Sequence, residues 1–285
     1  MQTIETLLSR GQELEASQPT EAAQLFSDVL ALDATNLTAH NALERMQAPQ
    51  AYGRWMMVNC VIDPADDIFR FFAHHEIAKN PIREYLSDGW RTLSELMLLL
   101  ESVDRPLSKT ASVLEFAAGF GRFTRHLVKA LPGRVTCSDV MPGSVAFLQE
   151  QFGVVAFESS HYPERITHAV QYELVFVLSM FTHLPAHMWS PWLRALKRML
   201  KPGGLLVFSV HNEQFAKKLG VAFDANGTHF IASSESPSID AKTYGTTFTT
   251  RKFVEDTVAS ALGSEPLSYK TLAFWNGQDA VVVRA

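Results

Sequence analysis

The sequence predicts a doubly wound α/β fold, with a mostly parallel seven-stranded Rossmann-like sheet that follows an all-helical N-terminal extension. Three observations lead to this fold class. From residue 111 onward, short strand-like segments alternate with segments whose apolar residues have helical spacing. The strand-like segments are apolar throughout, which indicates a parallel sheet covered by helices on both faces. The chain ends in two β-rich segments, 267–275 and 280–284, around the turn-forming pair Asn276-Gly277, which predicts a terminal antiparallel hairpin.

The individual elements of the sheet region follow from their boundaries. Pro132-Gly133 ends the first helix, Gly153 ends the second, and Gly263 ends the last. The predicted strands cover 111–116, 135–138, 154–157, 174–178 and 205–210, and the predicted helices cover 122–131, 144–152, 189–200 and 250–262.

The composition predicts a folded protein of a reducing compartment. The 285 residues are 47% hydrophobic and carry a formal net charge of -5. This balance excludes a disordered chain and argues against nucleic acid as a partner. Two cysteines, Cys60 and Cys137, are too few for a disulfide framework. No apolar stretch approaches the roughly 20 residues of a membrane-spanning helix, so we expect a cytoplasmic protein without membrane contact.

Residues 1–50 carry apolar stripes at helical spacing and are interpreted as a helical hairpin. The stretch 21–36, EAAQLFSDVLALDATN, resembles the second helix of a tetratricopeptide repeat, with Ala22 and Phe26 at the small and aromatic packing positions. A plain helical hairpin is the alternative. Because one repeat cannot bury its own apolar face, we expect this segment to pack on the rest of the chain, on a second copy in a homo-oligomer, or on a protein partner.

Residues 51–109 are predicted to form a helical cap. Asn80-Pro81 places a capping side chain before a proline in the first helical turn. Behind this pair, apolar residues from Ile82 to Leu100 form a long one-sided stripe, which predicts a helix. Phe71 and Phe72, which precede this helix, are interpreted as core residues.

The segment that carries chemistry covers residues 112–127, SVLEFAAGFGRFTRHL. A strand leads into Glu115, then into a loop with Gly119 and Gly121, and then into a helix. Glycines permit close backbone approach and unusual dihedral angles, and the start of a helix presents free N–H groups. A loop of this kind binds a nucleotide-like ligand at the carboxyl end of a strand.

The spacing of the glycines distinguishes two classes of ligand. The dinucleotide fingerprint G-x-G-x-x-G requires three glycines. At the corresponding positions this chain has Ala117, Gly119 and Arg122, so only the middle glycine is present. This argues against a pyrophosphate ligand. Read as E-x-x-x-G-x-G, the segment instead resembles motif I of the class I S-adenosylmethionine-dependent methyltransferases, with Ala117 in place of the first glycine. The resemblance implies S-adenosylmethionine as the cofactor, held by Glu115 and by the loop from Ala117 to Gly121.

A second match lies one strand further along the chain. In RVTCSDVMPGSV, Asp139 ends the strand, where a carboxylate can accept hydrogen bonds from both ribose hydroxyls. A cap for the next helix is the alternative for this aspartate. The resemblance also implies cofactor contacts from Val140, Ser160 and Ser179. Tyr85, on the cap helix, is expected either to close over the cofactor or to serve in packing.

A third match, residues 172–212, resembles the fourth strand of this family, its active-site loop, the next helix and the Lys-Pro-Gly-Gly turn into strand five. The Ser-x-Phe-Thr-His-Leu string within it is typical of a branch that methylates small molecules and sugars. The resemblance covers about residues 110–285, and residues 55–108 resemble the cap of that branch. It implies methyl transfer to a small-molecule acceptor, such as a hydroxyl of a sugar or a secondary metabolite. The alternative is a catalytically inactive cofactor-binding or scaffolding protein that acts through residues 1–50.

Candidate catalytic residues lie beyond the carboxyl ends of strands four and five. A hydroxyl acceptor needs a base near its proton, and His183 and His211 are candidates, together with Tyr244 at the end of the long segment 212–248. Because His211 directly follows strand five, we expect it, rather than His183, to be the base. His183 is expected to contact the cofactor loop.

A metal site is not predicted. His183 and His187 are four residues apart, but Pro185 lies between them and no acidic partner follows at ligand spacing.

Overall fold

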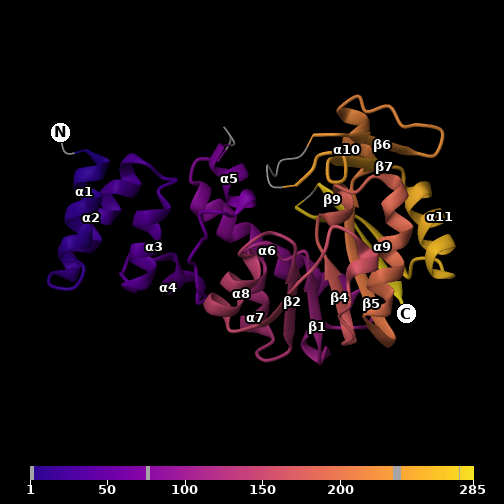
Figure 1. Ribbon diagram of the computed structural model, residues 1–285, viewed down its shortest axis with the longest axis horizontal. Coiled ribbons are helices and arrows are strands. Elements are labelled where there is room, and N and C mark those ends of the chain that lie inside the picture. Colours follow the sequence, from indigo (N-terminus) through magenta and orange to yellow (C-terminus); the bar gives the residue numbers. More distant parts are fainter. Residues whose placement is uncertain (1–2, 75–77, 234–238, 276) are drawn as a thin grey trace.

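A seven-stranded sheet forms one end of an elongated molecule, and the N-terminal helices form the other (Figure 1). The computed structural model describes residues 3–74, 78–233, 239–275 and 277–285. No helix in these ranges combines the length and the apolar character that crossing a membrane requires. The helices are α1 (Ile4–Leu14), α2 (Pro19–Leu32), α3 (Leu37–Arg45), α4 (Tyr52–Met56), α5 (Asp67–His74), α6 (Pro81–Glu101), α7 (Thr124–Ala130), α8 (Ser144–Phe152), α9 (Ala186–Arg198), α10 (Glu213–Lys218) and α11 (Arg251–Leu262). The strands are β1 (Val113–Phe116), β2 (Val135–Asp139), β3 (Val155–Glu158), β4 (Tyr172–Val177), β5 (Leu200–His211), β6 (Thr228–Ile231), β7 (Thr246–Thr249), β8 (Ser268–Phe274) and β9 (Gln278–Arg284).

The large sheet has the strand order β3-β2-β1-β4-β5-β9-β8. The first five of these strands are parallel, and β9 is antiparallel to both β5 and β8. The doubly wound fold and its antiparallel end are therefore confirmed. Asn276, the first residue of the predicted hairpin turn, lies outside the described residues. Because β1, β2, β4 and β5 run in the same direction, their carboxyl ends meet at one edge of the sheet.

Apart from the edge strand β3, the parallel strands are buried on both faces, as their apolar character predicts. Leu114 and Phe116 of β1 belong to a core that α9 and α11 cover. Val113, which alternates with them, belongs to a second core that α6, α7 and α8 cover. Because successive side chains of a strand point to opposite faces of the sheet, one apolar strand packs against helices on both sides.

Two element boundaries differ from the prediction. Helix α7 begins at Thr124 rather than at residue 122, because the turn that contains the positive φ angles of Gly119 and Gly121 continues through Phe123. The predicted turn at 202–204 is instead a bulge within β5, where the register with β4 shifts between Tyr172 and Leu174.

The cap helix α6 lies directly against the loop that follows β1. A Cβ atom on Gly89 would lie 2.0 Å from the backbone oxygen of Arg122. Only glycine therefore allows this approach of α6 to the loop. Helix α5 packs on the same helix, since the rings of Phe69 and Phe72 meet Tyr85 edge-on. The cap is thereby held over the edge of the sheet where the carboxyl ends of the strands meet.

Residues 1–50 contain three helices rather than a hairpin alone. Helices α1 and α2 pack together, and a Cβ atom on Gly11 would lie 2.7 Å from the ring of Phe26. Helix α3 attaches this group to the cap through His40 Nε2, which lies 2.8 Å from the backbone oxygen of Cys60. The segment thus packs on the rest of the chain. Its likeness to a tetratricopeptide repeat stays a prediction.

Replacing Asn41 by alanine should destabilise the chain without changing its ligand binding. The Asn41 side chain donates to the backbone oxygen of Ile62 at 2.8 Å and accepts from its N–H at 3.1 Å. Loss of this double contact should lower the free energy of unfolding by about 1–3 kcal/mol, as measured by urea denaturation. Gln24→Ala, an amide removed from an exposed position of α2, is the control and should stay within about 0.5 kcal/mol of wild type. Equal effects of the two changes would contradict this role of Asn41.

Candidate functional site

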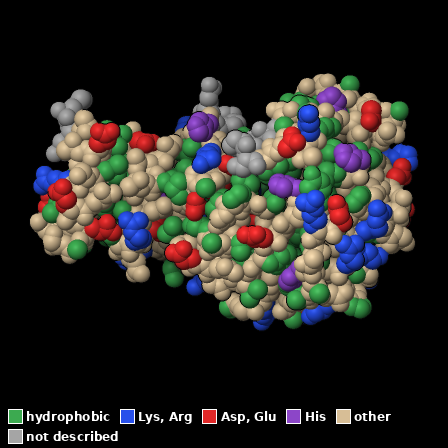
Figure 2. Space-filling view, in the orientation of Figure 1, with side chains coloured by type: hydrophobic (Ala, Val, Ile, Leu, Met, Phe, Trp, Pro, Cys, Tyr) green, Lys and Arg blue, Asp and Glu red, His purple; other side chains and the backbone are tan. Residues whose placement is uncertain are grey.

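A cleft of about 490 Å³ opens at the carboxyl ends of β1, β2, β4 and β5. Its walls are the loops after these strands, the cap helices α5 and α6, and residues between β6 and β7. Its volume lies in the range of small-molecule sites. Basic side chains gather over α9 on the face seen in Figure 2. The predicted site residues that line the cleft are Glu115, Ala117, Gly119, Asp139, Val140, Ser160, Ser179, His183, His211 and Tyr244.

Asp139 joins the end of β2 to the loop after β1. Its Oδ2 atom accepts a hydrogen bond from the Gly119 N–H at 2.7 Å, and its Oδ1 atom accepts one from the Met141 N–H at 2.8 Å. Gly119 has a positive φ, and a Cβ atom added there would meet no atom within 4 Å. The carboxylate therefore holds a loop whose open face borders the cleft, and it retains acceptor capacity for a ligand.

Gly121, predicted as a cofactor contact, does not line the cleft. A Cβ atom there would lie 2.4 Å from Phe152 Cε2 and 3.0 Å from Leu148 Cδ2. Its role is the close approach of the loop to α8. Ala117 lines the cleft with a φ of 62°, a left-handed conformation that favours the glycine it replaces.

Glu115 lies at the end of β1 and is buried, although it borders the cleft. Its Oε2 atom accepts a hydrogen bond from Thr124 Oγ1 at 2.7 Å. Burial, and to a smaller extent the neighbouring Asp139 carboxylate, raise the pKa of Glu115 to about 8. The side chain is therefore mostly protonated at neutral pH in the absence of a cationic ligand.

The raised pKa of Glu115 should make stability fall as the pH rises. The ordinary pKa is 4.5 and the folded value is about 8, so between these values the folded state binds more protons than the unfolded state. The stabilisation is complete below about pH 4.5 and is lost as the pH passes about 8. Glu115→Gln should flatten the unfolding free energy over this interval, as measured by denaturation at several pH values. Glu158→Gln, on the exposed edge strand, should leave the slope unchanged. A wild-type slope in Glu115→Gln would refute this account.

Tyr85, the other predicted contact that does not line the cleft, is fully buried behind its wall. Its hydroxyl donates to Asp66 Oδ2 at 2.5 Å. Asp66 does line the cleft, and its Oδ1 atom accepts from the N–H groups of Ile68 and Phe69 at the start of α5. This geometry supports a packing role for Tyr85 rather than closure over the cofactor.

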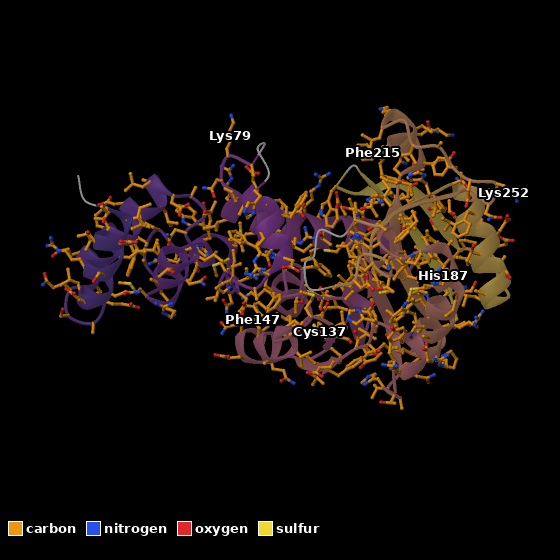
Figure 3. All side chains as sticks on the ribbon, turned by 45° about the horizontal axis from the view of Figure 1, so that its top comes forward. Lys79, Cys137, Phe147, His187, Phe215 and Lys252 are labelled. Atoms are coloured by element: carbon orange, nitrogen blue, oxygen red, sulfur yellow. The ribbon has the colours of Figure 1, made fainter. Side chains whose placement is uncertain are left out.

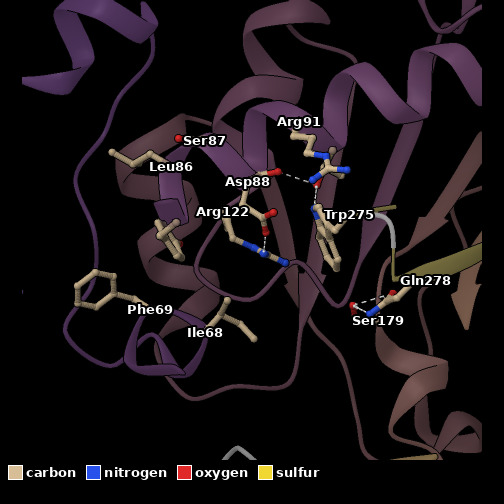
Figure 4. A network of polar contacts seen from close by, with 12 residues as sticks. Ile68, Phe69, Leu86, Ser87, Asp88, Arg91, Arg122, Ser179, Trp275 and Gln278 are labelled. Atoms are coloured by element: carbon tan, nitrogen blue, oxygen red, sulfur yellow. Dashed lines mark hydrogen bonds and ion pairs between the residues drawn. The ribbon is translucent and has the colours of Figure 1, made fainter. Parts of the chain in front are cut away.

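A polar network that sequence reasoning missed lies between the cap and the loop (Figure 4). Arg122 forms an ion pair with Asp88 of α6, and its guanidinium carbon lies 4.6 Å from the centre of the Trp275 ring. Trp275 Nε1 donates to Thr92 Oγ1 of the same helix at 3.1 Å. The spacing of Asp88 and Thr92, one helical turn apart, was the available signal. It is weak because Trp275 is 183 residues away in sequence.

The loop after β4 is held by side chains from β5 and β9. Ser179 has a φ of 63°, and its backbone N–H donates to Ser209 Oγ at 2.8 Å. Gln278 Nε2 donates to Ser179 Oγ at 3.0 Å (Figure 4). This strained turn is therefore anchored on β5 and on β9, the next strand beyond it, at the floor of the cleft.

Both candidate histidines line the cleft, and both donate from Nδ1 to a backbone oxygen. His183 Nδ1 lies 2.7 Å from the oxygen of Gly245, and His211 Nδ1 lies 2.8 Å from the oxygen of Thr247. Because a carbonyl oxygen only accepts, Nδ1 carries the proton in each ring and Nε2 is the acceptor of the neutral form. Burial lowers the pKa of His183, which keeps it neutral at pH 7. The ring of His183 stacks on Tyr244, with 4.5 Å between ring centres.

Aromatic residues of α5 contribute the opposite wall. Phe72 packs against the buried cluster around Tyr85 and also lines the cleft. The interpretation as a core residue is wrong for Phe71, which lines the cleft and is 42% exposed. Phe69 and Phe72, three residues apart, occupy the face of α5 that meets Tyr85 of α6. Phe71 therefore lies on the side of the helix toward the cleft. In the described ranges, no three His, Cys, Asp or Glu side chains come together as they would around a metal ion.

The comparisons with known proteins agree with this geometry. A family model described as a methyltransferase domain matches residues 113–204. No curated protein matches the chain. Among solved structures, the fold is similar to that of a magnesium protoporphyrin IX methyltransferase from Synechocystis (TM-score 0.51, 13% identity, 76% of this chain and 93% of that chain). It is also similar to that of a sugar N-methyltransferase from a Streptoalloteichus species (TM-score 0.51, 17% identity, 71% and 91%).

Proposed function

We propose that this protein, whose residues 113–204 form a methyltransferase domain, transfers a methyl group from S-adenosylmethionine to a small-molecule acceptor. The match to that domain agrees with the enzyme class expected from the sequence. The observation that carries the proposal is the Asp139 carboxylate, bonded to the open Gly119 loop inside a cleft at the carboxyl ends of the strands. This is where nucleotide-like ligands bind in open α/β sheets.

The residues present fit S-adenosylmethionine. The cleft has room for a ligand of this size, and the carboxylates of Asp66, Glu115 and Asp139 line it, which favours a cationic molecule. When bound, S-adenosylmethionine supplies a methyl group on a positively charged sulfur. We assign the ribose to Asp139, and the methionine part to the loop from Ala117 to Gly119.

The remaining cleft residues are assigned from their position and from the family resemblance. Val140 and Ser160, after β2 and β3, would contact the adenosine part, and Ser179, after β4, would lie near the reacting end. The role of the chain in such a displacement is mainly to align acceptor, methyl and sulfur. Both His183 and His211 border the acceptor side, and we propose His183 as the base. His183 is half-buried, burial lowers its pKa, and its tautomer is fixed by Gly245. The sequence-based preference for His211 remains the competing prediction.

Release of S-adenosylhomocysteine tests the proposal. The purified protein is incubated with S-adenosylmethionine and a panel of sugars, amino sugars, phenols and amines, and the product is quantified by chromatography. We expect at least one acceptor to raise S-adenosylhomocysteine formation well above the blank without acceptor. Cofactor binding without product from any acceptor would favour the alternative, an inactive cofactor-binding or scaffolding protein. Failure to bind the cofactor would contradict both.

A further inference from the structure

A buried arginine lies behind the loop that follows β1. Arg125, the second residue of α7, is 1% exposed, although charged side chains are rarely buried. Its Nε atom donates to the backbone oxygen of Gly121 at 3.0 Å, and its backbone N–H donates to the same oxygen at 3.3 Å. Asp139 holds the loop at Gly119. Arg125 thus supplies a second anchor, at the end of the loop where α7 begins.

The same guanidinium binds the segment that connects α4 to α5. Its Nη1 atom donates to the backbone oxygens of Asn59 and Val61, at 3.1 Å in each case. The oxygen between them, that of Cys60, lies 2.8 Å from His40 Nε2 of α3. Arg125 and α3 therefore bind alternate peptide groups of this segment. In this way the loop is connected to the part of the chain that leads into the cap.

Rings from the two neighbouring helices enclose the guanidinium. Its carbon lies 5.6 Å from the centre of the Tyr85 ring on α6 and 5.2 Å from the centre of the Phe152 ring on α8. Ring faces stabilise a cation, but the buried Nη2 atom has no hydrogen-bond partner among the described residues. A buried charge with an unmet donor opposes folding, and an apolar side chain of similar size would pack here at a lower cost. Packing alone therefore does not account for an arginine at this position.

The backbone of Ala117 explains why the loop needs a second anchor. Its φ of 62° is a left-handed conformation, which costs free energy in a residue other than glycine. Such a conformation persists only where the surrounding structure holds it. If the loop were released at Gly121, Ala117 could relax toward ordinary backbone angles while α7 and the sheet stayed folded.

We infer that Arg125 is a positioning residue for the cofactor: it fixes the backbone of Gly121 relative to the cap, so that the loop from Ala117 to Gly119 keeps the conformation that borders the cleft. Arg125 does not itself line the cleft and acts through Gly121. The inference rests on the proposed function. It means that a buried side chain outside the cleft sets the affinity for the cofactor.

Two substitutions of Arg125 test the inference. Arg125→Met keeps the length of the side chain and its contact with the two rings but has no donor. Arg125→Lys keeps the charge but lacks the planar fork that reaches Gly121 and segment 59–61 together. Binding of S-adenosylhomocysteine is measured by calorimetry, and unfolding by urea denaturation. We expect Arg125→Met to bind about tenfold or more weakly, the scale of a lost hydrogen bond to a charged group. Arg125→Lys should fall between Arg125→Met and the wild type.

Asn41→Ala is the matched control. Asn41 binds the same connecting segment from α3, at the N–H and oxygen of Ile62, but does not reach the loop. It should lower stability and keep wild-type affinity. An equal loss of affinity in Asn41→Ala would show that general destabilisation is the cause and would overturn the inference. Wild-type affinity in Arg125→Met would also overturn it, as would wild-type affinity in Arg125→Lys if the methionine variant does not fold.

Hydrogen exchange supplies a readout that needs no cofactor. The amides of residues 117–123, followed by mass spectrometry of the peptide that contains them, should exchange faster in Arg125→Met than in the wild type and in Asn41→Ala. Unchanged exchange in Arg125→Met would contradict the anchoring role of this side chain. A folded wild type that does not bind S-adenosylhomocysteine would instead remove the proposed function and leave the exchange result to stand by itself.

Discussion

Replacing His183 by glutamine is expected to lower the rate of methyl transfer by about a hundredfold or more, the usual contribution of general-base catalysis. Glutamine keeps a side chain that can donate to the backbone oxygen of Gly245, as Nδ1 does now at 2.7 Å. It has no nitrogen that can accept a proton near pH 7. The affinity for S-adenosylmethionine should change little, because the assigned cofactor contacts other than Ser179 lie on other loops, and Ser179 is held by Ser209 and Gln278 rather than by His183. Turnover and cofactor binding are measured on the same preparations.

Two further histidine variants make this result decisive. His187→Gln changes an exposed residue of α9 (Figure 3) and should keep wild-type turnover. His211→Gln tests the competing prediction from the sequence, and we expect it to reduce turnover less than His183→Gln does. Full activity of His183→Gln would show that His183 is not a base and that the chain acts only by orienting the reactants. A larger loss in His211→Gln would reassign the base to the end of β5.

The second large effect is expected from Gly121→Ala. Gly121 has a φ of 80°, in the left-handed region, where a residue with a Cβ atom is strained. A Cβ atom there would also lie 2.4 Å from Phe152 Cε2. Backbone strain of about 1–2 kcal/mol and overpacking of about 1–3 kcal/mol should together lower the free energy of unfolding by about 2–5 kcal/mol. The displaced loop should also bind S-adenosylmethionine more weakly. Urea denaturation and calorimetry measure the two effects.

Gly133→Ala separates strain from packing. Gly133 has a φ of 72°, but a Cβ atom there would meet nothing within 4 Å, so only the strain of about 1–2 kcal/mol should appear. Its cofactor affinity should match that of wild type. An equal loss of unfolding free energy in Gly121→Ala and Gly133→Ala would contradict this explanation. Backbone strain alone, and not the contact of the loop with α8, would then account for the glycine at position 121.

The sheet could be predicted because its signals are local. Apolar strands and the glycines that end the helices lie within short stretches of sequence, and β1, β2, β4 and β5 form where they were expected. The same holds for Asp139, since the last residue of a parallel strand necessarily reaches the edge where ligands bind. In these cases, the residue type and its position along one helix or strand were sufficient to predict where the residue lies.

Other parts of the site depend on contacts between distant segments, which no local pattern reports. Trp275 reaches Arg122 only because β8 and α6 lie beside each other. Gly121 matches a cofactor motif, yet its requirement for glycine comes from Phe152 on the neighbouring helix. Phe71 is of a residue type usually found in the core, but it is 42% exposed because Phe69 and Phe72 occupy the face of α5 toward α6. Tertiary packing decided each of these outcomes.

The most direct test of the central claim is a calorimetric titration of the wild type and of Asp139→Ala with S-adenosylmethionine. Loss of a hydrogen bond to a charged acceptor costs about 1.5–3 kcal/mol, and about 1.4 kcal/mol corresponds to a tenfold change. We therefore predict that the wild type binds the cofactor and that Asp139→Ala binds it about tenfold or more weakly. Asp139→Asn, which can still accept from the Gly119 N–H, should fall between the two. No binding to the wild type, or equal affinity in Asp139→Ala, would contradict the placement of the cofactor in this cleft.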